Sequence, residues 1–166
     1  MTEAGLTLES PRIGQKIRFL ETAAQTGGER LVIEATMQPG AFMPPHVHLG
    51  QTEDFDILEG EGRFRVAGRT HVAHAGEIVH VPSGIPHRFR NASGSEVHLR
   101  ATLRPALRTE DLFEQLFRLG AAGRVNRLGA PSPRITARLI REFRHEFFYL
   151  AGLPVSIQRL LEGARP

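Results

Sequence analysis

The run from Gly40 to Gly60, GAFMPPHVHLGQTEDFDILEG, constrains the fold more than any other part of this 166-residue chain. His46 and His48 are separated by one residue, and on an extended strand that spacing directs both imidazoles to the same face. The four residues after them form a polar, glycine-bearing link of hairpin length, and the strand-like stretch that follows begins with Glu53. A hairpin at this point returns Glu53 to the histidine pair.

A second segment, Gly76 to Asn91, GEIVHVPSGIPHRFRN, carries the next candidate ligand. Its apolar part, Ile78 to Val81, is typical of a short buried strand. Two prolines and a glycine then form a turn that leads into His87. His87 is therefore a candidate fourth ligand beside His46, His48 and Glu53.

Three imidazoles and one carboxylate suit a first-row transition ion, namely Fe, Mn, Ni, Cu, Co or Zn, whereas calcium and magnesium prefer oxygen ligands. Four protein ligands fill a tetrahedral zinc ion but leave about two positions open on an octahedral ion, where a substrate or dioxygen can bind. The chain has eight histidines, and any single one is more often structural than a ligand. The joint spacing of four candidate ligands with turn residues favours the metal site.

These two segments resemble the cupin superfamily at ten positions. Gly40, His46, His48, Glu53 and Gly60 match the first cupin motif, and Gly76, Pro82, Gly84, His87 and Asn91 match the second. The resemblance implies a mainly β protein, an antiparallel double-stranded β-helix (jelly-roll) barrel, with a divalent metal on His46, His48, Glu53 and His87. It does not specify a reaction, because cupins range from dioxygenases and isomerases to proteins that only bind or store.

Alternating apolar residues predict the remaining strands of the barrel. Leu31 to Met37 and Val97 to Leu103 alternate clearly, Arg63 to Ala67 is a strand between glycine turns, and Lys16 to Leu20 is a short edge strand. Counting from the ligands directs four apolar side chains inward as candidate pocket residues: Phe55, Ile57, Phe64 and Phe89. The alternative for each of them is plain core filling.

Beyond Pro105 the apolar period becomes helical. Thr109 begins a helix that ends at Gly120 or Gly123, a second helix runs from Ile135 to Phe148, and a short third one begins at Pro154. We therefore divide the chain into a barrel domain, 1–105, and a helical extension, 106–166. The apolar faces of these helices suit a cap on the barrel mouth, packing on its outer wall, or a contact between two copies. The order of barrel and helices resembles that of small bacterial cupins.

Composition limits the partners and the compartment. The chain has no cysteine, which excludes disulfides and thiolate metal sites. Its start has neither the basic region nor the apolar core of a signal peptide, and no stretch is apolar enough for a membrane helix, so we expect a cytoplasmic protein. Residues 105–166 carry 10 arginines against 6 acids, a scattered excess that is typical of a solvated surface. We expect a small-molecule ligand and a homodimer, with no nucleic-acid or membrane partner.

Two classes of function fit these features. The first is a metal-dependent enzyme acting on a small organic molecule, an oxygenase first and an isomerase or decarboxylase next, in which Glu53 leaves the ion and moves a proton. His80 would assist as a base if its side chain turned inward, whereas His71 and His74 fit solvated loop positions. The second class is a non-catalytic metal or small-ligand binding or sensor module whose C-terminal helices relay occupancy.

Overall fold

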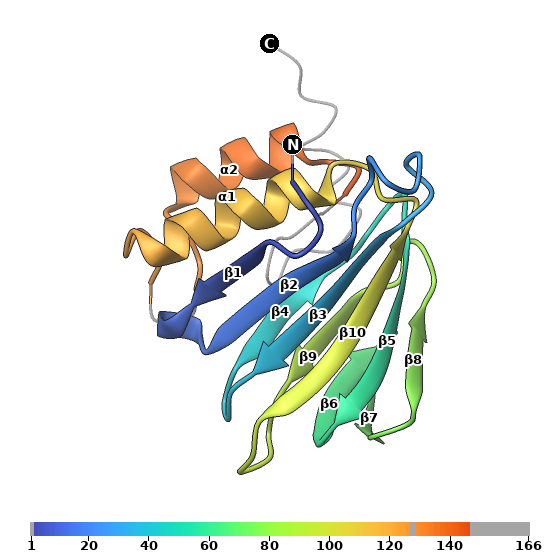
Figure 1. Ribbon diagram of the computed structural model, residues 1–166. Coiled ribbons are helices and arrows are strands. Elements are labelled where there is room, and N and C mark those ends of the chain that lie inside the picture. Colours follow the sequence, from blue (N-terminus) through green and yellow to red (C-terminus); the bar gives the residue numbers. More distant parts are fainter. Residues whose placement is uncertain (1, 127–128, 147–166) are drawn as a thin grey trace.

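The computed structural model describes residues 2–126 and 129–146, which form ten strands, one 3₁₀ turn and two α-helices (Figure 1). The elements are β1 (Thr7–Ser10), η1 (Pro11–Ile13), β2 (Gln15–Glu21), β3 (Leu31–Met37), β4 (Phe42–His46), β5 (Thr52–Glu59), β6 (Glu61–Val66), β7 (Arg69–His74), β8 (Ile78–Val81), β9 (His87–Arg90), β10 (Val97–Arg104), α1 (Thr109–Ala121) and α2 (Pro133–Glu142).

The strands form two antiparallel sheets. The six-stranded sheet has the order β1-β2-β3-β10-β5-β8, and the four-stranded sheet has the order β4-β9-β6-β7. The two sheets face each other, and their inner surfaces share one apolar core (Figure 1). Strands that follow one another in the chain often lie in opposite sheets, as they do in a jelly roll. The predicted fold class, a mainly β jelly roll with C-terminal helices, is confirmed.

The predicted alternation places the expected side chains in this core. β3 matches its predicted bounds, and its inward residues from Leu31 to Met37 are buried. In β5 the buried residues Phe55 and Ile57 alternate with the partly exposed Asp54 and Asp56. Period-2 patterning is reliable here because one face of each strand meets the core and the other meets water.

Three local predictions were wrong. The predicted edge strand at Lys16 to Leu20 is the interior strand β2, because β1, which the sequence analysis missed, pairs along its outer side. His71 and His74 are exposed as expected, but they lie in β7 and not in a loop. Gly62 is not a turn residue: it lies within β6, where an added Cβ would come 2.4 Å from a ring carbon of Phe89.

The two helices cover the β1 edge of the six-stranded sheet. α1 packs on β1, and α2 lies against the other side of α1 (Figure 1). The apolar face of α1 is divided between two cores: Phe113 and Phe117 contact the barrel core, while Leu112 joins Leu139 and Phe143 in a smaller cluster. α2 ends at Glu142, earlier than predicted, and the expected third helix lies outside the described residues. The domain boundary at residue 105 and the dimer stay predictions.

No helix within residues 2–126 and 129–146 has the length and apolar character needed to cross a membrane.

Candidate metal centre

The four predicted ligands come from three strands and one loop in both sheets. His46 ends β4 and His87 begins β9, and these two residues are direct partners in the four-stranded sheet. His48 lies in the loop after β4, and Glu53 is the second residue of β5 in the opposite sheet. The ligands therefore meet in the interior, between the sheets.

The link between His48 and Glu53 was predicted as a hairpin, and this prediction was wrong. β4 pairs with β9, whereas β5 pairs with β10 and β8, so the link crosses from one sheet to the other. Glu53 still returns to the histidine pair, because the two sheets face each other across a narrow interior. The crossing puts the carboxylate opposite the imidazoles instead of beside them.

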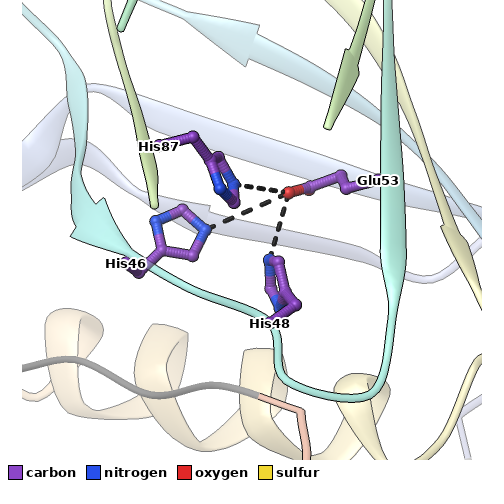
Figure 2. Close-up of side chains that lie close together, drawn as sticks. All are labelled: His46, His48, Glu53 and His87. Carbon is purple, nitrogen blue, oxygen red and sulfur yellow. Dashed lines mark hydrogen bonds and ion pairs between the residues drawn. The ribbon is translucent and has the colours of Figure 1, made fainter. Parts of the chain in front are cut away.

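The ligand atoms converge on one point. The Glu53 Oε2 atom lies 2.9 Å from His87 Nε2, 3.1 Å from His48 Nε2 and 4.0 Å from His46 Nε2 (Figure 2). One ligand atom from each of the four residues lies within 4.8 Å of all the others, and all four residues are buried. This is the spacing expected of donors that share a single ion.

The outer nitrogens of the three rings decide which atoms face the centre. Nδ1 of His46 lies 2.8 Å from the Pro44 carbonyl oxygen, and Nδ1 of His87 lies 3.1 Å from that of Ile85. Nδ1 of His48 bonds the carbonyl oxygen of Glu146. A carbonyl oxygen only accepts, so each Nδ1 carries a proton and Nε2 of each ring faces the centre. A neutral ring presents the lone pair of Nε2 there, whereas a protonated ring presents an N–H that can donate to Glu53.

Three lone pairs and a carboxylate oxygen that point at each other require a positive charge between them. The protein can supply it in one of two ways: as a proton on an imidazole, or as a bound cation. A divalent transition ion satisfies all four donors at once, and nitrogen ligands select it over calcium or magnesium. The chemistry of the donor set therefore fits the metal that the sequence predicts, without specifying which element it is.

The pKa values of these groups reflect the same requirement. Burial is the largest influence on each and by itself disfavours the charged form. For Glu53 the charge and hydrogen bonds of His48 and His87 outweigh burial, so the pKa of the carboxyl lies well below its usual range. The pKa of His48 is raised, because the charge and hydrogen bond of Glu53 overcome burial. The pKa of His46 is lowered by burial and by repulsion from His87 and His48.

The four predicted pocket residues all lie inside the barrel. Phe55, Ile57, Phe64 and Phe89 are at most 1% exposed. Only the ring of Phe55 lies near a ligand, with its centroid 6.0 Å from that of His87, and Phe64 packs between Phe55 and Phe89. Their role as pocket lining stays a prediction. A hollow of about 550 Å³ lies instead on the outer face of the six-stranded sheet, lined by Lys16, Arg18, Glu34 and His98 among others, and it contains none of the ligands.

His80 does not reach the centre. It lies between the buried Val79 and Val81 on β8, so strand alternation directs its ring outward. The side chain is 58% exposed, and its Nδ1 lies 2.5 Å from Asp54 Oδ1. The His80 ring does not turn inward, so the condition for its predicted role as a base is not met.

Two residues near the centre were missed by the sequence analysis. Gln51 is buried in the loop between His48 and Glu53, and its amide donates to Pro105 O at 2.7 Å, Ala106 O at 3.1 Å and Thr109 Oγ1 at 2.9 Å. Glu146 is buried, and its carbonyl is the partner of His48. Neither could be found from local patterns, because each contact joins segments more than 50 residues apart.

Comparisons with known proteins agree with this geometry. Residues 33–102 match the sequence model of the cupin domain family. An oxalate-binding protein of Thermotoga maritima is 29% identical over 85 residues, which are 51% of this chain and 70% of the relative. The crystal structure of a predicted oxalate decarboxylase from Thermotoga maritima superposes with a TM-score of 0.53 at 26% identity, over 55% of this chain and 80% of that one. KdgF from Halomonas sp. superposes with a TM-score of 0.53 at 12% identity, over 58% of this chain and 84% of that one, which shows a shared fold.

Proposed function

The chain belongs to the cupin superfamily, and on that premise we propose that it holds one divalent first-row transition ion on His46, His48, Glu53 and His87 and binds a small organic acid of the oxalate type to that ion. The observation that carries the proposal is the convergence of three Nε2 lone pairs and one carboxylate oxygen on a single buried point. α1 and α2 lie outside the family match, which ends at residue 102.

The net charge of the proposed metal centre favours an acidic ligand. Three neutral imidazoles and one carboxylate leave a divalent ion with a net positive charge, in an interior of low dielectric constant where that charge attracts an anion strongly. When bound, the ion supplies a Lewis acid that polarises a coordinated oxygen. The ring of Phe55 beside His87 keeps the inner side of the centre apolar. The names of the Thermotoga maritima matches support the oxalate type: a protein sequence is named for binding oxalate, and a crystal structure is named as a predicted oxalate decarboxylase.

Catalysis is the finer part of the proposal. The sequence favoured an oxygenase first and an isomerase or decarboxylase next, and the name of the Thermotoga maritima crystal structure favours decarboxylation. Decarboxylation of oxalate breaks the carbon–carbon bond, releases carbon dioxide and adds a proton to the remaining carbon to give formate. Among the described residues, Glu53 is the carboxylate at the centre, and it would have to leave the ion and take up a proton before it could deliver one to carbon. The alternative is a binding or sensor module in which the acid is held without turnover.

The test begins with elemental analysis of the purified, untagged full chain. We expect one transition ion per chain in the wild type and in His98→Ala, a matched control whose exposed ring pairs with Glu96. We expect little metal in His46→Ala, which removes a buried ligand. A wild-type protein that takes up no transition metal from a metal-supplemented solution contradicts the proposed site.

Ligand binding and turnover are then measured separately. Calorimetric titration with oxalate should give heat with the metal-loaded wild type and none with the chelator-treated protein. Release of carbon dioxide and formate from oxalate, or oxygen uptake with a panel of small acids and dicarbonyl compounds, would establish an enzyme. Metal-dependent binding without turnover would establish the binding module, and metal without any binding of acids would refute the proposed ligand class.

A further inference from the structure

The three histidines of the centre differ in what holds their outer nitrogen. His46 and His87 each bond the carbonyl oxygen of the residue two positions earlier in their own segment, Pro44 and Ile85. These partners form whenever the strand forms. His48 instead bonds the carbonyl oxygen of Glu146, which lies 98 residues further along the chain. The orientation of one ligand therefore depends on a segment that is not part of the barrel.

Residues 143–146, called the docking segment below, are anchored on α1 and α2. Phe143 is fully buried with Leu112 and Leu139. The guanidinium of Arg108 lies 5.0 Å from the centre of the Phe143 ring. The backbone N–H of Arg108, at the N-terminus of α1, donates to Glu146 Oε1 at 3.1 Å, and Glu146 is buried. Because a buried carboxylate needs its partners, this contact fixes where residue 146 lies.

The loop that carries His48 meets the docking segment and α1 together. A Cβ added at Gly50 would lie 3.4 Å from the carbonyl oxygen of His145, so the two backbones are in contact. One residue further on, Gln51 donates to the carbonyls of Pro105 and Ala106, just before α1, and to the hydroxyl of Thr109, its first residue. The loop between His48 and Glu53 is therefore held by the helical extension along most of its length.

From these contacts we infer that the docking segment is a positioning element for the metal centre. The Glu146 carbonyl holds the His48 ring with Nε2 toward the ion. Metal binding and docking of residues 143–146 therefore stabilise each other. The inference rests on the proposed metal site and adds a regulatory element to it. Partners of the outer nitrogen fix the tautomer and direction of a ligating histidine, and their loss typically lowers metal affinity by about 10- to 100-fold. By linkage, the metal favours the docked segment by the same factor.

The first test measures Co²⁺ affinity of the full chain by competition with a coloured chelator. Glu146→Ala removes the acceptor of the Arg108 N–H and should weaken Co²⁺ binding by about 10- to 100-fold. Glu146→Gln keeps an oxygen acceptor and should restore most of the affinity. Glu142→Ala is the matched control, because its side chain also reaches Arg108, at 3.6 Å, but lies on the surface of α2 and should leave the affinity unchanged. The visible spectrum of bound Co²⁺ should change in Glu146→Ala alone.

The second test uses the wild type, so it does not depend on the folding of any variant. The amides of Phe143 and Glu146 donate to Leu139 O at 2.8 Å and Phe143 O at 3.2 Å, and their hydrogen exchange reports opening of the docking segment. Zn²⁺ should slow this exchange by about the factor by which docking strengthens metal binding. Exchange that is unchanged by Zn²⁺, or Glu146→Ala with wild-type Co²⁺ affinity, overturns the inference while leaving the metal site intact. A wild type that binds neither ion overturns both.

Discussion

Replacing Glu53 by Gln in the metal-free protein tests the charge balance at the centre. Glu53 Oε2 lies within hydrogen-bond distance of His48 and His87, and all three side chains are buried. In the wild type the pKa of His48 is raised above its ordinary value of 6.5. Protonated His48 therefore stabilises the folded state fully below pH 6.5, and this contribution is lost as the pH rises through the raised pKa.

Glu53→Gln should reverse this dependence. Without the carboxylate, only the hydrogen bond to the Glu146 carbonyl still opposes burial, which is the larger influence on His48. The pKa of His48 should therefore fall below its ordinary value, so that its protonation opposes folding. Between pH 8 and pH 5.5 the variant should lose about 1–3 kcal/mol of stability relative to the wild type, the usual cost of a buried group left without its partner. The pKa of Glu53 itself is depressed, so its contribution in the wild type is lost only at pH values below this range.

The measurement is urea unfolding in the presence of a chelator at several pH values, followed by circular dichroism because the chain has no tryptophan and one tyrosine. Asp54→Asn is the matched control: it removes the neighbouring carboxylate, which pairs with His80 and Arg104 on the outer face of β5. The control should keep the wild-type pH dependence of the centre. If Glu53→Gln also keeps it, the coupling of Glu53 and His48 derived from the structure is incorrect.

Three further predictions concern packing and metal uptake. Gly62→Ala should lower the free energy of unfolding by about 1–3 kcal/mol in thermal or urea unfolding, because its Cβ would overlap the ring of Phe89. The control Gly94→Ala has open space around the added Cβ and should stay within about 0.5 kcal/mol of the wild type. Equal effects of the two substitutions would contradict the tight packing at β6. Removing residues 106–166 should expose the barrel surface that Phe117 covers and cause aggregation in size-exclusion chromatography, so a monodisperse truncation would show that the helices do not protect the barrel. Metal affinity measured by chelator competition should fall as the pH drops through the raised pKa of His48, because the proton and the ion compete for Nε2. An affinity that does not depend on pH would exclude His48 as a ligand.

Strand alternation and motif spacing predicted much of the barrel, for a simple physical reason. In β3, β5 and β10 one face packs on the core, so burial repeats every second residue and is visible in the sequence. The alternation did not predict strands in which the two faces differ little in burial. β7 exposes four consecutive residues before Ala73, and β1 is a four-residue edge strand with one buried side chain. Such strands are held by pairing with a neighbour, which local composition does not record.

The His80 result follows from the same rule. Its position on β8 was predicted, and the buried valines on either side of it leave the ring only the outer face. Once strand and register are known, the side chain has no freedom to turn inward. There it pairs with Asp54, its direct partner across the β5–β8 ladder.

The sequence by itself identified the four residues that cluster at the centre, their nitrogen-rich chemistry and the strands that carry three of them, because motif spacing and apolar period are local properties of the chain. The tertiary structure alone decided that the link from His48 to Glu53 crosses between sheets, and that Gln51 and Glu146 hold the loop around it. These features depend on backbone carbonyls and on sheet pairing between distant segments. Every residue has a carbonyl, so no residue type marks the one that the fold brings to His48.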